Sequence, residues 1–545
     1  ACGKKLTNSQ HMKNRPISPV LTSASSPVFG SILPVFSDFT DEDASIDYWL
    51  RKHRDYVGPP RTKIFCTIGK SSSSADMLGR LFEAGMNVAV CDFSRESRAF
   101  HEDAIKKIRA MEKKTRKLCA VLLATRGPAI QTGALKDGLD SVRLKRGQEY
   151  VLHTDEKTMG DDTQISVKYS EFPKLVKVGS TILMDNGAAT LIVKQVSDRR
   201  VTCQVQSDCH FGSQKTLNVP GTVLKEIPSV TQRDVADIKF GVQMGVDFIA
   251  ASFVRSASDI RTIREILANS GRHIQIIAKI QNEEGLRNFD EILDCADGII
   301  ISRSDLGLDI PMERVPLATK LMIRKCNGAG KPVVTATQML QSMCLNPTPT
   351  RAEASDVGNA IFDGSDGVML TGETSSGLYP EESVKMMALI CRESEQSINY
   401  QATFQSIHER ATSLPGPNSI AESLSSSAVK TAFDLEASVL IVFTFSGRTA
   451  RLVSKYRPSA PILMLTESIA VARQGLVSRG LIPLLVGSMS GSTTLFNRAI
   501  SVAKSLRICE KGDVAVLVSG GKGDSVFQQL EQDDSNVIRV IRLVY

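Results

Sequence analysis

The stretch IQIIAKIQNEEG, residues 274–285, decides the fold. Its first seven residues form a nearly continuous apolar run, which is typical of a β-strand covered on both faces in a parallel sheet. Lys279 and Gln281 stand two residues apart at the end of this run, so their side chains are expected to point the same way. A lysine at this place indicates an anion site. A glutamine beside it is unexpected, because a carboxylate there would pair with the lysine or hold a metal.

A buried strand followed by an amphipathic helix recurs along much of the chain. One such helix is SASDIRTIREILANS, which opens on the candidate caps Ser256 and Ser258. Eight strand–helix units that close on themselves predict an α/β fold, a (β/α)8 TIM barrel, with its chemistry at the carboxyl ends of the strands. The strands are predicted at 62–68, 87–93, 119–125, 246–252, 274–280, 297–302, 332–337 and 366–371.

Two further domains and an arm complete the predicted organisation. Residues 126–225 carry short alternating segments with Gly, Asp and Asn turns, which predict an inserted all-β lid domain over the barrel mouth. Residues 399–545 predict a C-terminal α/β sandwich domain with an open sheet. The barrel is therefore assigned to 46–125 and 226–398, and the Ser- and Pro-rich residues 1–45 to a disordered arm.

Composition excludes several classes of protein. With 42% hydrophobic and 23% charged residues, the chain is typical of soluble globular proteins, and it has no apolar run near the roughly 18 residues of a membrane helix. The net charge of +7 is dispersed, which argues against nucleic-acid binding. The eleven cysteines lack zinc-ligand spacing and indicate free thiols in the cytoplasm. The alternative is an organelle, because the Ser-rich arm has no acidic residue before Asp38 and suits a transit peptide.

Several segments resemble the pyruvate kinase family, roughly over residues 60–545 and in the family's order. The resemblance implies phosphoryl transfer from phosphoenolpyruvate to ADP in glycolysis, giving pyruvate and ATP, with Mg²⁺ (or Mn²⁺) and K⁺. It also implies a homotetramer, or a mixed oligomer with an active paralogue. The segments that carry it are TKIFCTIG, EAGMNVAV, DGIIISRSDLGLDIP, KPVVTATQMLQSM, PTRAEASDVGNAIFDGSDGVMLTGETSSGLYP and SGRTA.

The resemblance assigns roles to residues near the strand ends. Lys279 matches the catalytic lysine that offsets charge on the phosphoryl group and enolate, and Thr337 matches the threonine associated with proton delivery. Asp305 matches a metal-binding aspartate, and the backbone of Ser304 and Asp305 stands where the substrate carboxylate is received. Lys215 on the lid is a further substrate-binding residue. The alternatives are that Lys279 is a strand-end lysine reaching solvent, Thr337 a β-branched strand residue and Asp305 a helix cap.

Several cation and phosphate ligands of the family are replaced in this chain. The metal-binding glutamate corresponds to Gln281, and the monovalent-cation ligands Ser94 and Thr125 are joined by Asp92 in place of an asparagine. The other replacements are a phosphate-binding arginine by Val90, a histidine by Arg95, the monovalent-cation aspartate by Ala124, a glutamate by Ala129, a phosphate-binding arginine by Gln131 and a lid glycine by Thr216.

These replacements predict slower chemistry. An amide oxygen still coordinates magnesium but brings no charge, and a unit charge pair at ~4 Å is worth about 4 kcal/mol at an effective dielectric near 20. A loss of about 3–4 kcal/mol slows a reaction roughly 10²–10³-fold. Val90 and Gln131 remove two cationic donors, which Arg95 and Arg126 offset in part. The sequence predicts a pyruvate kinase homologue with impaired or lost turnover, and the alternative is a fully active enzyme with a remodelled metal site.

Two loops are further candidates for binding. TFSGRT follows a strand and opens a helix, so its backbone suits a phosphate, and it matches the family's sugar-phosphate effector loop. Phe445 stands there in place of a lysine, so activation by a sugar bisphosphate is not expected. On the lid, Asp185 in MDNG is either a site residue or part of a hairpin turn. The residues of the effector loop are Thr444, Ser446, Gly447, Arg448 and Thr449.

Overall fold

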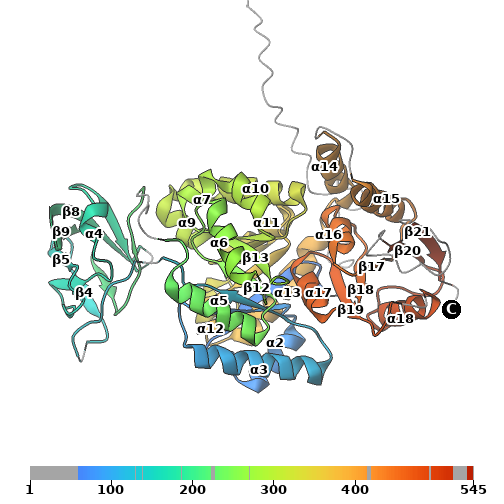
Figure 1. Cartoon of the computed structure of the whole chain (residues 1–545), viewed down its shortest axis with the longest axis horizontal. Helices are drawn as coiled ribbons and strands as arrows, with labels where there is room; N and C mark the ends of the chain where they lie inside the picture. Colours follow the sequence, from blue (N-terminus) through green and yellow to red (C-terminus); the bar gives the residue numbers. More distant parts are fainter. Residues whose placement is uncertain are drawn as a thin grey trace, which may run out of the picture.

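The computed structural model arranges the chain as three bodies in a row (Figure 1): the β lid, the barrel and the C-terminal α/β body. The predicted arm, residues 1–45, and Ala129 lie outside the described residues. No helix in the described part of the chain is long and apolar enough to cross a membrane. The structure describes residues 59–128, 130–137, 139–185, 187–221, 228–268, 270–413, 419–489, 492–519 and 537–543.

The central body is a closed barrel of eight parallel strands in the order β1-β16-β15-β14-β13-β12-β3-β2, which confirms the predicted fold. Its strands are β1 (Lys63–Thr67), β2 (Val88–Asp92), β3 (Ala120–Ala124), β12 (Phe248–Ala251), β13 (Gln275–Ile280), β14 (Gly298–Ser302), β15 (Val333–Ala336) and β16 (Gly367–Leu370). The surrounding helices are α2 (Ala75–Ala84), α3 (Arg98–Thr115), α5 (Gln232–Met244), α6 (Ala257–Leu267), α7 (Glu283–Arg287), α8 (Phe289–Cys295), α9 (Arg303–Asp309), α10 (Val315–Ala329), α11 (Arg351–Phe362), α12 (Gly372–Ser375) and α13 (Pro380–Gln396), with 3₁₀ turns η1 (Met312–Arg314) and η2 (Gln341–Cys344).

Local sequence sets where several barrel helices begin. Of the two candidate caps of α6, the structure uses Ser256, which forms a capping box with Asp259. Thr231 and Asp234 form the same reciprocal arrangement at the start of α5. Each box satisfies backbone N–H groups that the first helical turn leaves without partners. The helices therefore start at fixed residues, which holds the strand ends in register.

Strand β13 shows how the barrel is packed. Ile276, Ala278 and Ile280 belong to the cluster formed with the surrounding helices, whereas Ile277 belongs to the cluster that fills the lumen. Because side chains alternate along a strand, Lys279 lies on the lumen side with Ile277. The lumen cluster also contains Leu476 and Val477, which come from the C-terminal body and close the lumen at the amino ends of the strands.

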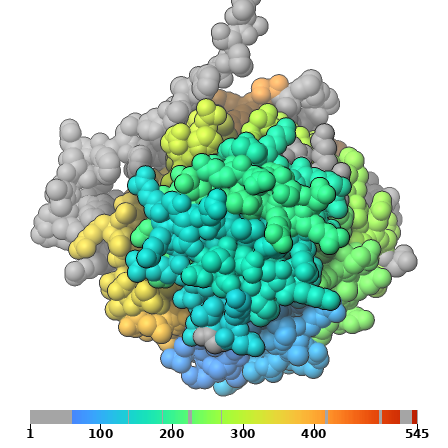
Figure 2. All heavy atoms as spheres, turned by 90° about the vertical axis from the view of Figure 1, so that its left-hand side faces the viewer, coloured from blue at the N-terminus to red at the C-terminus, as the bar shows by residue number. Residues whose placement is uncertain are grey.

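The lid is an all-β body inserted after β3. It has a two-stranded sheet, β10-β4, and a six-stranded sheet in the order β11-β7-β8-β9-β5-β6. Seen from its own side, the lid lies in front of the barrel (Figure 2). Its elements are β4 (Val142–Leu144), β5 (Glu149–His153), β6 (Gln164–Ser166), α4 (Phe172–Leu175), β7 (Thr181–Met184), β8 (Ala189–Ser197), β9 (Arg200–Val205), β10 (Cys209–Phe211) and β11 (Leu217–Asn218).

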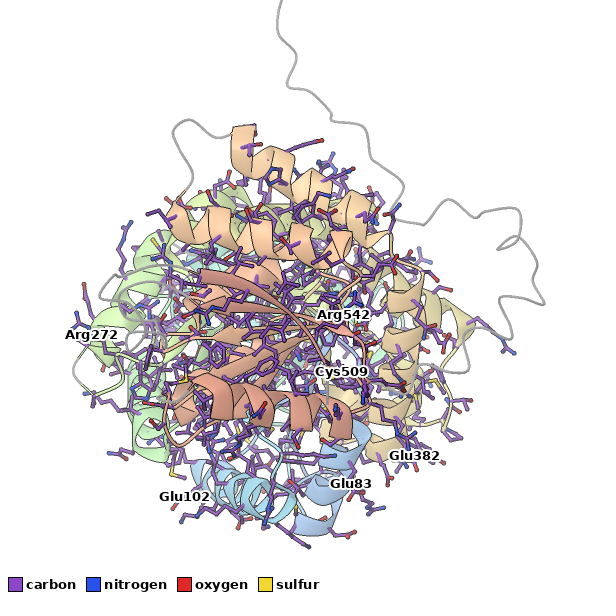
Figure 3. The ribbon with its side chains drawn as sticks, turned by 90° about the vertical axis from the view of Figure 1, so that its right-hand side faces the viewer. Glu83, Glu102, Arg272, Glu382, Cys509 and Arg542 are labelled. Atoms are coloured by element: carbon purple, nitrogen blue, oxygen red, sulfur yellow. The ribbon has the colours of Figure 1, made fainter. Side chains whose placement is uncertain are left out.

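The C-terminal body is a five-stranded sheet in the order β19-β18-β17-β20-β21, in which only the β20–β21 pair is antiparallel among the described strands. Helices lie on both faces of the sheet (Figure 3), as the predicted sandwich requires. Its elements are α14 (Tyr400–Ser413), α15 (Ile420–Asp434), β17 (Val439–Phe443), α16 (Arg448–Lys455), β18 (Ile462–Thr466), α17 (Ile469–Gln474), η3 (Gly475–Val477), β19 (Leu481–Leu485), α18 (Ser492–Ser505), β20 (Val514–Ser519) and β21 (Val537–Arg542).

Buried charges join the C-terminal body to the barrel. The Arg457 guanidinium donates to both carboxylate oxygens of Asp366, at 2.8 and 3.0 Å, and the two side chains are only 5% and 6% exposed. Arg479 lies close to Glu395, which accepts from the backbone of Thr62 at the start of the barrel. These contacts complement the apolar plug of Leu476 and Val477, so the two bodies share one interior.

We expect Arg457→Met to destabilise the protein. The substitution leaves the buried Asp366 carboxylate without its bidentate partner, and breaking a buried ion pair on one side costs about 3–5 kcal/mol. Guanidinium denaturation followed by circular dichroism measures the loss. Arg498→Met, at an exposed position on α18, is the matched control and should change the unfolding free energy by less than about 0.5 kcal/mol. Equal effects of the two substitutions would contradict the assigned role of Arg457.

Candidate active site

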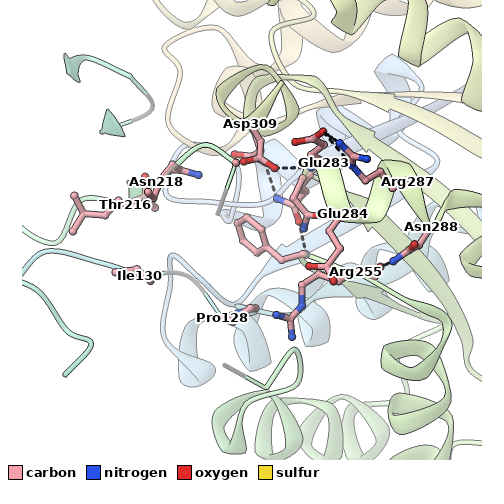
Figure 4. Close-up of a pocket in the computed structure, with 17 residues that line it drawn as sticks. Pro128, Ile130, Thr216, Asn218, Arg255, Glu283, Glu284, Arg287, Asn288 and Asp309 are labelled. Atoms are coloured by element: carbon pink, nitrogen blue, oxygen red, sulfur yellow. Dashed lines mark hydrogen bonds and ion pairs between the residues drawn. The ribbon is translucent and has the colours of Figure 1, made fainter. Parts of the chain in front are cut away.

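A cleft of about 360 Å³ lies between the lid and the carboxyl ends of the barrel strands. Its lid wall includes Ile130, Leu217 and Val219, and its barrel wall includes Gln281 and Asp305. Figure 4 shows Thr216 and Asn218 facing the acidic barrel-side residues Glu283 and Asp309 across this space. Burial raises the pKa of Asp309 above its ordinary value. The lid wall therefore includes several apolar side chains, whereas the barrel wall carries acidic residues together with Arg255 and Arg287.

Gln281 is the central side chain of the barrel wall and is only 5% exposed. Its amide oxygen accepts a hydrogen bond of 2.8 Å from the backbone N–H of Phe253. Because that partner is a donor, the amide nitrogen must face the other way, and it donates to Asp305 Oδ2 at 2.7 Å. The amide oxygen, which is the atom that could coordinate magnesium, thus already accepts one hydrogen bond from the protein.

Asp305 lies in the first turn of α9, whose N-cap is Ser302, so Asp305 is not the cap itself. Its Oδ2 atom accepts from the Ser302 hydroxyl at 2.6 Å as well as from Gln281. Two short hydrogen bonds therefore satisfy one oxygen of this carboxylate. No described group of three or more His, Cys, Asp or Glu side chains is arranged to hold a metal ion.

Lys279 lies on the lumen side of β13 and is partly buried. Its ammonium donates to the Ser252 hydroxyl at 3.3 Å. Among the described residues, no carboxylate lies within 4 Å of this ammonium group. Lys279 is thus a cation at the barrel mouth without an acidic partner in the described part of the chain.

Thr337 and Ser304 are brought together at the ends of β15 and β14. The Ser304 N–H donates to Thr337 Oγ1 at 2.9 Å, and the Thr337 hydroxyl donates to the Ala336 carbonyl at 2.6 Å. Thr337 has a φ of 70°, an unusual value for a β-branched residue. Arg303 holds this turn by donating to the Thr337 carbonyl at 2.7 Å while pairing with Asp356.

The residues assigned to a monovalent cation bond to their neighbours. Asp92 Oδ1 accepts from both the backbone N–H and the hydroxyl of Ser94, at 3.0 and 2.6 Å, and its Oδ2 lies 3.5 Å from the Arg95 guanidinium. The Thr125 carbonyl accepts from the Ser252 hydroxyl at 2.6 Å. Asp92 and the Thr125 carbonyl therefore already accept hydrogen bonds from the protein, whereas the Ser94 hydroxyl acts as a donor.

The two positions assigned to phosphate binding, Val90 and Gln131, carry no arginine. Val90 is fully buried in the lumen cluster. Arg126 instead pairs with the buried Asp237 at 3.1 Å, a carboxylate that also pairs with Arg98. Gln131 forms an isolated antiparallel β-bridge with Thr216 of the lid. The Arg126 guanidinium, from which partial compensation is expected, is therefore paired with Asp237 in this geometry.

The remaining candidates lie on the lid and in the C-terminal body. Lys215 forms an ion pair of 3.0 Å with Asp185, and Asp185 has a φ of 51° in the turn between β7 and β8, so it is both a turn residue and an ion-pair partner. The effector loop lies at the start of α16, in the body opposite the lid (Figure 1). In that loop the Gly447 N–H donates to the Thr444 hydroxyl at 2.9 Å, and the Arg448 N–H donates to the Ser446 hydroxyl at 3.3 Å. Thr449, in the first turn of α16, is buried.

Phe253 and Ser252 are site residues that sequence reasoning missed. Phe253 has a φ of 56°, supplies the N–H that orients Gln281, and lines the cleft. Ser252 contacts both Lys279 and Thr125. The sequence feature that could have identified them is their position at the end of a predicted strand, because the chemistry of a barrel belongs at the carboxyl ends of its strands.

A lid-covered (β/α)8 barrel with a lysine, an aspartate and a threonine at its strand ends defines a class of barrel enzyme with an inserted β lid. Family models described as pyruvate kinase, barrel domain, and pyruvate kinase, alpha/beta domain, match residues 59–384 and 422–541. The chain belongs to the pyruvate kinase family, whose members are phosphotransferases.

Individual relatives agree over most of the chain. It is similar to the pyruvate kinase of Dictyostelium discoideum, with 46% identity over 84% of this chain and 91% of the relative. It is 43% identical to the cytosolic isozyme of Glycine max, over 86% of this chain and 95% of that protein. The crystal structure of a pyruvate kinase from Cryptosporidium parvum aligns with a TM-score of 0.80 and 38% identity, covering 89% and 96% of the two chains.

The family generally uses Mg²⁺ and K⁺. In this chain, the side chains placed to bind the divalent ion do not fit it. A metal ion needs lone pairs, but the side chain beside Asp305 presents an N–H group. The same Asp305 oxygen already accepts a second hydrogen bond from Ser302.

Gln281→Glu should make stability depend on divalent metal. The new carboxylate would face Asp305 where a 2.7 Å hydrogen bond now lies, so the two charges would repel each other in chelator and attract an ion when it is supplied. Mn²⁺ at 100 times its dissociation constant would then stabilise the variant by about 2.7 kcal/mol. Thermal unfolding with EDTA or Mn²⁺ measures this. Gln281→Leu, which removes the hydrogen bonds without adding charge, should show no response, and an equal response of the unaltered protein would contradict the argument.

Proposed function

We propose that this chain is a pyruvate kinase homologue whose turnover of phosphoenolpyruvate and ADP is impaired or lost. The observation that carries the proposal is the orientation of the Gln281 amide, whose nitrogen donates to the carboxylate expected to hold the metal. Phosphoryl transfer depends on cations that neutralise charge on the moving group. Both the Mg²⁺ and the K⁺ site are weakened in this proposal.

The phosphate-binding cations point to the same conclusion. Val90 is buried in the lumen, and Arg126 is held by Asp237. Lys215 is paired with Asp185 on the lid. The alternative, a fully active enzyme, is supported by Lys279, Thr337 and Asp305, which lie at neighbouring strand ends. However, only one of these three side chains is a cation.

The proposal includes assembly with other subunits. Met312, Leu317 and Leu321 are 76%, 62% and 48% exposed along η1 and α10 and form an apolar stripe. Such a stripe favours an interface, either in a homotetramer or in a mixed oligomer with an active paralogue. We place the protein in the cytoplasm, because relatives such as that of Glycine max are cytosolic isozymes. A protein with this role would influence active subunits through contact.

A coupled assay with phosphoenolpyruvate, ADP, Mg²⁺ or Mn²⁺, and K⁺ tests the proposal. We expect turnover at least about 10²-fold below the ordinary enzyme value of about 10 s⁻¹. The triple variant Gln281→Glu, Val90→Arg, Gln131→Arg should regain activity, because it restores one metal ligand and two phosphate donors. Lys279→Met in that background should abolish the regained activity.

Two results would count against this explanation. Ordinary turnover by the unaltered chain would overturn the proposal itself. A folded triple variant that remains inactive would overturn the cause assigned to the defect. Because Val90 is buried, circular dichroism must confirm folding, and the double variant Gln281→Glu, Gln131→Arg provides a second measurement without an arginine in the lumen.

A further inference from the structure

Two linkers join the lid to the barrel, and the first, residues 126–128, is fixed to α5 by a buried carboxylate. The backbone N–H groups of Arg126 and Gly127 both donate to one oxygen of Asp234, at 3.0 and 3.1 Å. The other oxygen accepts from the N–H and the hydroxyl of Thr231, at 2.9 and 2.7 Å. Asp234 is only 1% exposed, so these four hydrogen bonds are shielded from water. The lid therefore begins at a fixed point on the barrel.

Gly127 also lies against the end of strand β12. Its φ is 69°, and a Cβ at this position would stand 2.9 Å from the Phe253 ring and 3.1 Å from Ser252 Cβ. The linker approaches this closely only because residue 127 has no side chain. Phe253 in turn donates its N–H to the Gln281 amide oxygen at 2.8 Å. The first linker thus packs directly on the residue that orients Gln281.

The second linker, which the structure describes as far as Gly221, is fixed by the last turn of α9. The Asp309 carboxylate accepts hydrogen bonds from the Gly221 N–H and from the Glu283 N–H at the start of α7, the latter at 2.5 Å (Figure 4). Beside it, Leu308 Cδ2 lies 3.2 Å from the place where a Cβ of Gly187, in a lid turn, would stand. The end of α9 therefore holds the lid where the chain returns to the barrel.

One amide connects these two attachments. The Gln281 nitrogen donates to Asp305 Oδ2 at 2.7 Å, in the first turn of the helix whose last turn carries Asp309. This helix, α9, has seven residues, or about two turns, so a shift at one end is passed to the other. A continuous line of contacts therefore runs from Gly127 through Gln281 and α9 to Gly221.

We propose that the Gln281 amide couples the two linkers, so that the lid moves at both together and swings at neither alone. The line consists of polar groups that are buried or partly buried, and leaving such a group without its partner costs free energy. Opening the lid at one linker therefore displaces a hydrogen bond that fixes the other. The coupling concerns lid motion and not turnover, so it does not depend on the proposed function.

Hydrogen–deuterium exchange of the full chain, read by mass spectrometry, tests the coupling by altering one linker and measuring the other. Gly127→Ala pushes the added Cβ into Phe253, and we expect exchange at Gly221 to become at least about tenfold faster. Asp309→Ala removes the acceptor for Gly221, and exchange at Arg126 and Gly127 should become faster by a similar factor. A coupling free energy between two sites acts equally in both directions.

Matched variants separate coupling from a general loss of stability. Gly147 lies in the lid with a φ of 84° and no atom within 4 Å of an added Cβ, so Gly147→Ala introduces similar backbone strain without touching the barrel. Gln474 is as buried as Gln281, at 5% exposure, and its amide donates to the His273 carbonyl at 2.6 Å. Gln281→Leu should make exchange faster at both linkers, whereas Gly147→Ala and Gln474→Leu should leave both unchanged.

Faster exchange confined to the altered linker in Gly127→Ala and Asp309→Ala would overturn the proposal. An equal effect of Gln474→Leu would also overturn it, because reduced stability would then explain the result. Circular dichroism establishes that each variant is folded. If Gly127→Ala does not fold, Gln281→Leu decides the question, since unchanged exchange at either linker rules out the coupling. Ordinary turnover in the coupled assay would overturn the proposed function and leave this inference standing.

Discussion

A buried amide must satisfy both of its ends, and at Gln281 this requirement organises the barrel mouth. The backbone N–H of Phe253 takes the oxygen, so the nitrogen is left for Asp305. This chain of hydrogen bonds links the ends of three neighbouring strands, β12, β13 and β14. A glutamate could accept from Phe253 in the same way, but its second oxygen would then need a cation. An amide NH2 group in place of one carboxylate oxygen therefore alters what the whole mouth can hold.

The surrounding polar residues follow the same pattern. Ser252 donates to the Thr125 carbonyl, Ser94 donates to Asp92, and Arg303 holds the turn at Thr337. Each contact satisfies a buried or partly buried polar group, which would otherwise cost free energy. The result is a site whose geometry is maintained by the protein alone. Retention of the barrel together with replacement of cation ligands is consistent with demand on the fold that outlasts demand on the chemistry.

Much of the fold could be predicted from the sequence, because strands covered on both faces are continuous apolar runs and helices start at recognisable caps such as Ser256. Alternation along β13 could also be predicted, whereas the side on which Lys279 lies needed the structure, which places Ile277 in the lumen. The orientation of Gln281 could not be predicted, since it depends on the N–H group of Phe253, which follows the neighbouring strand β12. The pairing of Arg126 with Asp237 was equally hidden, because both the partner and the competing Arg98 come from other segments.

The plug formed by Leu476 and Val477 has a consequence for how this protein can change over evolutionary time. A TIM barrel usually fills its lumen with side chains from its own strands. Here part of that filling comes from the C-terminal body, which also supplies Arg457 to the buried Asp366. Deleting that body would open the lumen to water and strand a carboxylate in the interior. The protein therefore cannot be shortened to a bare barrel, and its gene must retain the C-terminal body for structural reasons alone.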